Sequence, residues 1–267
     1  DLAKNELGFD VTNAQFTEKV GTRLLFVYFD QDKERSFTNY KGSRSDLMIE
    51  ASELDLSQIR RCKVFNYTPL SFEFDYPIAK AAELALAEAH SAGVMTAFDS
   101  NYRFPYEDMK VYHAVQDAIY SAQILKLSQD DIRYFMKEEN VFSACEKLLA
   151  GNAKIVAFTM GTSGSLLYTH KGWSYRPAYR VNALDTTGAG DSFMGALIYL
   201  LTHETDNIEE LSVLDLERIG DFCNACAAAS TMKRGSLLVM PALSQIEHVL
   251  KTAPRIETQF DKIHKTF

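Results

Sequence analysis

The chain has 267 residues, of which 46% are hydrophobic, and it carries a formal net charge of −8. This length suits one large or two small α/β domains. The negative charge argues against nucleic acid or an anionic membrane as the main partner, and no apolar stretch approaches the length that spans a bilayer. Of the four cysteines, only Cys223 and Cys226 are close together, and the sequence has no second pair of ligands at zinc spacing. This use of cysteine fits a reducing, cytoplasmic setting.

The beginning of the chain predicts a β-hairpin. Residues 23–29 and 35–40 are rich in β-branched and aromatic side chains, and the polar residues 30–34 between them suit a turn. Apolar residues occupy both alternating sets of the first strand, so both of its faces are apolar. An apolar face without cover usually marks an interface. A polar connector, residues 41–45, follows the hairpin.

Strand-like and helix-like segments alternate along the rest of the chain. The expected strands are residues 64–66, 94–98, 124–127, 155–159, 165–168 and 174–181. The expected helices are residues 78–92, 111–121, 141–150, 190–201, 215–232 and 243–251. This alternation predicts an α/β fold with a central, mostly parallel sheet and helices on both faces. We expect the charged tail from Ala253 to dock loosely.

Polar clusters follow three of the expected strands, at residues 99–103, 126–131 and 159–164. Ligands bind beyond the carboxyl ends of strands in such sheets. Each cluster alone is compatible with an ordinary loop, because Asp, Asn, Ser and Gly dominate turns. A fourth cluster, described next, makes one shared site the better interpretation.

The fourth cluster is the run Asp-Thr-Thr-Gly-Ala-Gly-Asp-Ser-Phe at residues 185–193. Gly188 and Gly190 lie where a loop becomes a helix, and unpaired amides at a helix N-terminus bind anions. Asp191 would stand beside that anion as a base, which is what phosphoryl transfer to a hydroxyl needs. The alternative is a plain helix cap.

The run resembles the D-T-x-G-A-G-D signature of the ribokinase (PfkB) family of carbohydrate kinases, and the similarity extends from about Leu2 to Leu250. The resemblance is nearest to the fructokinase and 2-keto-3-deoxygluconate kinase subgroup. It implies a ribokinase-like three-layer sandwich with a small β-hairpin lid, the lid and connector being residues 1–45 and the kinase domain residues 46–267. It also implies ATP-dependent phosphoryl transfer to a sugar hydroxyl, most like a fructokinase. The alternatives are 2-keto-3-deoxygluconate kinase, another sugar or nucleoside kinase, or a non-catalytic sugar-binding relative.

The resemblance assigns the transfer and substrate roles as follows. Asp191 is the catalytic base, and the amides of Gly188, Ala189 and Gly190 hold charge on the transferring group. The substrate loop resembles D-P-N-x-R, with Ser100 in place of Pro. The substrate contacts that this loop implies are Asp99, Asn101 and Arg103, together with Asp191.

Further motifs imply the nucleotide site. Lys126 and Ser128 resemble the first positions of K-x-N-x-x-E, and Asp131 stands in place of its Glu. Asp131 would touch the water shell of Mg²⁺. The T-x-G-x-x-G nucleotide loop is matched by Thr159, Gly161 and Gly164, and Asn224 falls in the helix beside adenine. The implied cofactors are ATP and Mg²⁺, with a monovalent cation such as K⁺ beside the loop of Asp185 in several relatives.

One feature of the family has no counterpart in the chain, the early G-G-x-x-x-N segment that binds the sugar. We expect either a segment ahead of Asp1 or an inactive, shortened relative. A nicotinamide-dependent dehydrogenase is disfavoured because no G-x-G-x-x-G follows a first strand. The expected partners are a small-molecule sugar and a second copy of the chain, paired through the hairpin; the alternative is that strands ahead of Asp1 cover the apolar face.

Overall fold

The computed structural model describes residues 2–5, 8, 10–29, 35–39, 44–101, 106, 108–205 and 207–258. Its contacts divide the chain into two compact units. The first comprises Asp1–Cys62 and Leu70–Val94, and the second Lys63–Pro69 and Met95–Phe267. The boundary expected at residue 45 stays a prediction.

The first unit contains the hairpin. Strands β1 (Leu25–Phe29) and β2 (Arg35–Asn39) pair antiparallel, with Val27 opposite Phe37, as the sequence predicts. The predicted turn at residues 30–34 lies outside the described residues. On the hairpin, the side chains of Leu24, Leu25 and Phe26 are 50%, 45% and 57% exposed.

The remainder of the first unit is helical. It has α1 (Leu2–Asn5), α2 (Leu56–Arg61), α3 (Ile78–Ser91) and short 3₁₀ turns at residues 45–47 and 51–53. An ion pair of 2.5 Å between Arg60 and Glu88 links α2 to α3. The alanine-rich α3 ends as predicted before Gly93, whose φ of +70° belongs to the left-handed region that glycine adopts without strain.

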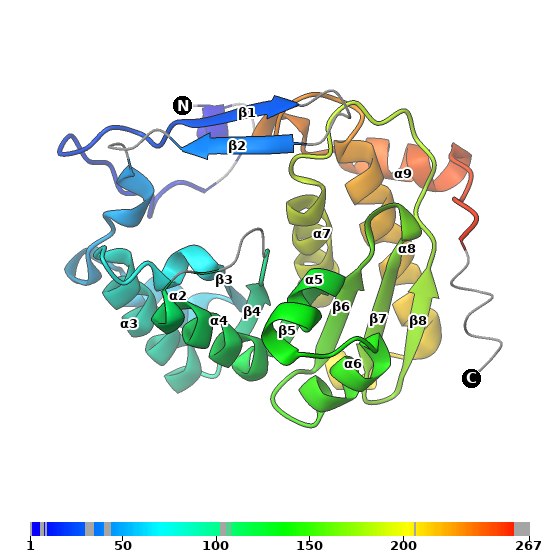
Figure 1. Ribbon diagram of the computed structural model, residues 1–267, viewed down its shortest axis with the longest axis horizontal. Coiled ribbons are helices and arrows are strands. Elements are labelled where there is room, and N and C mark those ends of the chain that lie inside the picture. The colour runs from blue at the N-terminus through cyan, green and yellow to red at the C-terminus, as the bar shows by residue number, and fades with distance from the viewer. Residues whose placement is uncertain are drawn as a thin grey trace. The chain divides into compact units, whose positions relative to one another are not determined.

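The second unit is built on a sheet of six strands in the order β3-β4-β5-β6-β7-β8. The first four strands are parallel: β3 (Val64–Tyr67), β4 (Met95–Asp99), β5 (Ile124–Ser128) and β6 (Ile155–Thr159). The last two, β7 (Ser165–Thr169) and β8 (Gly172–Arg176), run antiparallel to their neighbours (Figure 1). The predicted strand 174–181 is therefore wrong at its end, because Pro177 has no amide to donate to a ladder.

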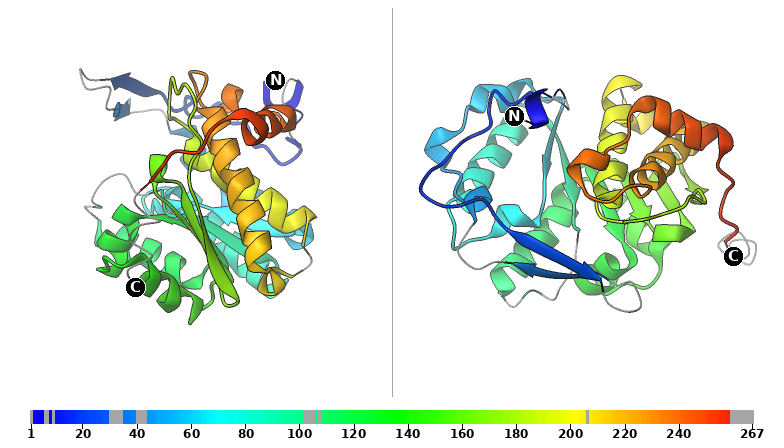
Figure 2. Two further views of the ribbon diagram at one scale, coloured as in Figure 1. Left: turned by 90° about the vertical axis from the view of Figure 1, so that its right-hand side faces the viewer. Right: turned by 90° about the horizontal axis from the view of Figure 1, so that it is seen from above.

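Helices cover both faces of this sheet (Figures 1 and 2). On one face lie α7 (Ala189–His203), α8 (Val213–Ser230) and α9 (Leu243–Thr252). On the other lie α4 (Met109–Ser121) and α6 (Val141–Leu149). Alternate residues of the strands, including Ala97, Ile124 and Ala157, pack against apolar side chains of α7 and α8 in one buried cluster. The unit is thus a three-layer α/β sandwich.

The cysteines are structural where they are buried. Cys223 and Cys226 lie inside α8, as expected, and Cys145 is buried in α6. Burial raises the pKa of Cys145 and of Cys226 to about 12. Cys62, at the end of α2, is exposed. Within the described residues, no helix has the length and apolarity needed to cross a membrane.

Candidate active site

The predicted polar clusters meet at the carboxyl edge of the sheet. Asp99 is paired in register with Lys126, and Ser128 with Thr159, so the ends of β4, β5 and β6 lie side by side. Ala97 and Ile124 belong to the buried cluster that includes apolar side chains of α7. Asp99 and Lys126 lie two positions further along the same strands, and alternate residues of a strand share a face. The two charged side chains therefore point to the face that α7 covers.

Asp99 and Lys126 form an ion pair inside the molecule. The Lys126 ammonium donates to both carboxylate oxygens of Asp99 at 2.8 Å. Burial raises the pKa of the Asp99 carboxyl above its ordinary value; the Lys126 charge opposes this shift and the nearby charge of Asp191 adds to it. The Asp191 carboxylate is thus part of the same electrostatic site, on the first turn of α7.

The loop before α7 has the geometry of an anion site. Gly188 is the N-cap of α7 with φ +81°, a conformation that L side chains rarely adopt. The Ala189 amide donates within the turn to Thr186, at 3.3 Å. The amides of Gly190 and Asp191 belong to the first turn, where a helix offers no acceptor of its own. The helix dipole adds positive potential there.

A segment after α8 supports this loop, and sequence reasoning missed it. The Gly235 amide donates to one carboxylate oxygen of Asp185 at 3.1 Å, and the Thr187 amide donates to the other at 2.9 Å. The Asp185 amide donates to Thr231, at 3.2 Å. The available signal was the Lys-Arg-Gly-Ser run directly after the helix, where Gly235 has φ +118°.

Ser128 and Asp131, predicted to lie near metal and phosphates, are found at the end of β5 and in the helical turn that follows it. Ser128 donates to one carboxylate oxygen of Asp131 through its amide, at 2.6 Å, and through its hydroxyl, at 2.5 Å. The other oxygen, Oδ1 of the buried Asp131, has no hydrogen-bond partner among the described residues. A buried oxygen of this kind fits a hydrated cation. No three described His, Cys, Asp or Glu side chains form a group that could hold a metal by themselves.

The predicted nucleotide loop is rigidly built. Gly161 and Gly164 both have positive φ, +55° and +98°. A Cβ at Gly164 would lie 2.1 Å from the carbonyl oxygen of Arg176, so only glycine fits. Below the loop, the Tyr175 hydroxyl donates to the Ser163 carbonyl at 2.5 Å. The Thr159 hydroxyl donates to the Leu127 carbonyl on β5, at 3.3 Å, which holds the end of β6 against its neighbour.

Asn224 supports the same loop from α8. Its side-chain amide is buried and donates to the carbonyl of Arg176 at 2.9 Å. The Arg176 guanidinium in turn pairs with Asp221, at 2.6 and 2.8 Å. In this structure Asn224 therefore holds the backbone beside Gly164; its predicted place beside adenine stays a prediction.

The chain after α9 docks firmly up to Thr258, against expectation. Arg255 pairs with Asp221 at 2.6 Å and lies over the Tyr179 ring, 3.8 Å from its centroid. The Thr258 hydroxyl lies 2.6 Å from that of Tyr175. These contacts place the segment next to the nucleotide loop. Because these contacts join residues distant in sequence, the charged composition of the tail could not reveal them.

In the predicted substrate loop, which starts at Asp99, the next predicted substrate contact is Asn101. This residue is exposed and has φ +36°, and its amide donates to the Asp99 carboxylate at 3.1 Å. Arg103, the other predicted substrate contact in the loop, lies outside the described residues.

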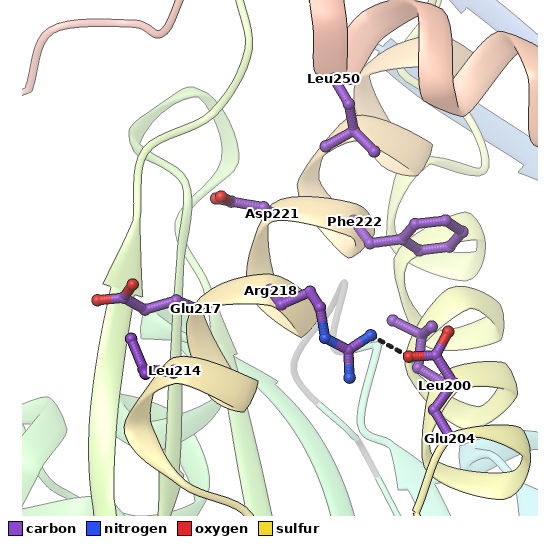
Figure 3. A pocket seen from close by; sticks show the side chains of 8 residues that line it. All are labelled: Leu200, Glu204, Leu214, Glu217, Arg218, Asp221, Phe222 and Leu250. Atoms are coloured by element: carbon purple, nitrogen blue, oxygen red, sulfur yellow. Dashed lines mark hydrogen bonds and ion pairs between the residues drawn. The ribbon is translucent and has the colours of Figure 1, made fainter.

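A separate cavity of about 390 Å³ lies between α7, α8 and α9 (Figure 3). Its walls include Leu200, Phe222 and Leu250, and an ion pair joins Arg218 to Glu204 across it. Leu200 is ten residues beyond Gly190 on α7, or about 15 Å along the helix. None of the predicted site residues lines this cavity.

The comparisons with known proteins agree on one family. Residues 3–243 match the pfkB family carbohydrate kinase. The chain belongs to this family. Among pfkB relatives, the Arabidopsis thaliana protein named "Probable fructokinase-4" is 30% identical over 249 residues, which cover 91% of this chain and 75% of that protein. The prediction of a carbohydrate kinase is confirmed: the chain is a sugar kinase, and its family transfers phosphate from ATP.

Solved structures establish the fold. The fructokinase with bound ATP from Xylella fastidiosa superposes with a TM-score of 0.75 at 23% identity, covering 88% of this chain and 75% of that one. A double mutant of the fructokinase from Vibrio cholerae O395, in its fructose, ADP and potassium ion bound form, gives 0.78 at 19%, covering 93% and 79%. The predicted ribokinase-like α/β fold is thereby confirmed.

Proposed function

We propose that this pfkB kinase is a fructokinase, which transfers the γ-phosphoryl group of ATP to a primary hydroxyl of fructose. The observation that carries the chemistry is Asp191 on the first turn of α7, directly after the glycine turn. The choice of fructose is supported by relatives named as fructokinases at about 30% identity. It is also supported by the bound fructose in the related Vibrio cholerae structure.

The proposed step needs one base and one anion site. Asp191 takes the proton of the sugar hydroxyl as its oxygen bonds to the γ-phosphorus. The bond from that phosphorus to the bridging oxygen breaks, and ADP leaves. The amides of Gly190 and Asp191 in the first turn of α7 hold the charge on the transferring group, an arrangement that stabilises the transition state electrostatically. Asn101 and Arg103 orient the sugar.

Mg²⁺ would be held by Asp131 through water and by the phosphates, and when bound it would neutralise phosphate charge. The buried, unpartnered Oδ1 of Asp131 supports this assignment. A monovalent cation such as K⁺ beside the Asp185 loop is supported by the potassium bound in the Vibrio cholerae relative.

We also propose that the enzyme is cytoplasmic and that it forms a dimer through the hairpin.

The experiment is a coupled assay of ADP release with Mg²⁺, over fructose, 2-keto-3-deoxygluconate, ribose and nucleosides. We expect kcat/KM for fructose to exceed the other values at least tenfold, about 1.4 kcal/mol of transition-state binding. A preference for 2-keto-3-deoxygluconate would replace fructose as the substrate. ATP binding without turnover on any acceptor would identify a non-catalytic relative.

A further inference from the structure

The buried carboxylate of Asp99 is engaged by groups of the protein itself, the Lys126 ammonium above all. Asp99 is 4% exposed and Lys126 is 7% exposed. Both carboxylate oxygens accept from the same ammonium at 2.8 Å, and one of them also accepts from the Asn101 amide at 3.1 Å. A residue that contacts sugar or phosphate would need to present its polar atoms to the open edge of the site.

The pair instead touches two turns that do face the site. A Cβ at Gly190 would lie 3.3 Å from Nζ of Lys126 and 3.4 Å from its Cε, so the ammonium packs directly under the first turn of α7. Asp99 holds the Asn101 amide and with it the positive φ of that residue, a backbone conformation uncommon outside glycine although Asn tolerates it better than most side chains. The two contacts lie at opposite ends of one ion pair.

The charges of the pair balance each other. A lone buried carboxylate or ammonium is strongly disfavoured, whereas a hydrogen-bonded pair is tolerated. The Lys126 charge also offsets that of Asp99, and no ion pair within the described part of the chain includes Asp191.

From this geometry we propose that Asp99 and Lys126 are positioning residues: as one neutral unit they fix the substrate loop at Asn101 relative to the anion site at Gly190. This inference rests on the proposed kinase function and refines it, because the pair then serves neither as sugar ligand nor as nucleotide ligand.

The test compares Lys126→Met, Asp99→Asn and the double variant with the wild type. Each single change leaves one buried charge unpaired, so we expect kcat to fall at least about 30-fold, while the Kd for ATP, measured by calorimetry, changes less than about threefold. The double variant should regain at least about tenfold in kcat over Lys126→Met. If Lys126 binds phosphate directly, ATP affinity falls more than tenfold and the double variant does not recover it; that result would overturn the proposal.

A second readout does not depend on turnover. Backbone amide resonances of Asn101 and Gly190 should both shift in each single variant, since the pair connects them. The matched control is Lys171→Met with Glu210→Gln, an exposed ion pair at the other end of β7, which should move neither resonance. Shifts confined to one of the two turns would refute the coupling. If no sugar is phosphorylated, the proposed function fails, but these spectra and the ATP affinities still decide the role of the pair.

Discussion

Gly188 and Gly190 are glycines for different physical reasons. Gly188 needs its positive φ, whereas Gly190 is helical and instead leaves room for the Lys126 ammonium. In Gly190→Ala the new Cβ would press on Nζ at 3.3 Å. We expect ATP-dependent turnover to fall at least about tenfold, while the melting temperature drops by only a few degrees because the lysine tip can shift.

The control for this substitution is Gly195→Ala on the same helix, where a Cβ would meet no described atom within 4 Å. Alanine there should stabilise the protein by about 0.5–1 kcal/mol and leave turnover unchanged. If Gly190→Ala loses stability but keeps its activity, the glycine serves only the fold.

Asp191 is the residue on which the proposed transfer step depends. Asp191→Asn keeps the size of the side chain but cannot take a proton. Turnover should fall at least about 100-fold with ATP affinity little changed. Rapid-quench measurement of phosphoryl transfer, with Asp117→Asn on α4 as an exposed control, separates chemistry from product release. Turnover within a fewfold of the wild type would remove Asp191 from the mechanism.

At the scale of elements, the Tyr175 hydroxyl is one of the groups that hold the predicted nucleotide loop. Tyr175 bridges the Ser163 carbonyl and Thr258. Tyr175→Phe should raise the KM for ATP about two- to tenfold, the worth of one hydrogen bond, without changing the KM for the sugar. Tyr168→Phe on neighbouring β7 is the control, since the Tyr168 hydroxyl lies away from the loop and donates to Glu146 at 3.5 Å. Equal effects on both KM values would argue for a global change in the fold.

The start of α6 carries a pH-dependent contact. A hydrogen bond from the Lys147 ammonium is the main cause that lowers the pKa of Glu138 from 4.5 to about 2. The Asn140 amide and the Ser143 hydroxyl also donate to this carboxylate and act in the same direction. A carboxyl whose pKa is lowered by folding contributes stability above its unfolded pKa and loses it as pH falls toward the folded value. The melting temperature of Glu138→Gln should therefore lie below that of the wild type at neutral pH, and the gap should shrink by pH about 3. A gap independent of pH would contradict this.

Much of the second unit could be predicted from local pattern. Buried runs such as residues 155–159 and amphipathic helices such as residues 141–149 carry their own periodic signal. What escaped prediction are contacts between residues distant in sequence. The pairing of Asp99 with Lys126 depends on the register of two strands, and the docking of Arg255 on Asp221 depends on tertiary position. Sequence placed the residues at the correct edge but could not say which would face a ligand.

At the scale of the whole molecule, we propose that the hairpin mediates dimerisation. Leu24 and Phe26 are about half exposed or more, and apolar surface of this kind favours an interface. We expect sedimentation at micromolar concentration to show a dimer, and Leu24→Asp with Phe26→Asp to give a monomer. Trp173→Ser, on the exposed edge strand β8, is the control and should leave the dimer intact. If the wild type and all variants sediment as monomers, dimerisation through the hairpin is contradicted.

The burial pattern of the thiols makes the native protein suitable for fluorescence. Three of its four cysteines are buried, and Cys62 is exposed in the first unit. Since thiol reactivity follows exposure and thiolate character, a maleimide dye should attach at Cys62 with no cysteine removed. A second dye on an introduced cysteine at position 171, in the other unit, would then report any movement between the units as sugar and ATP bind.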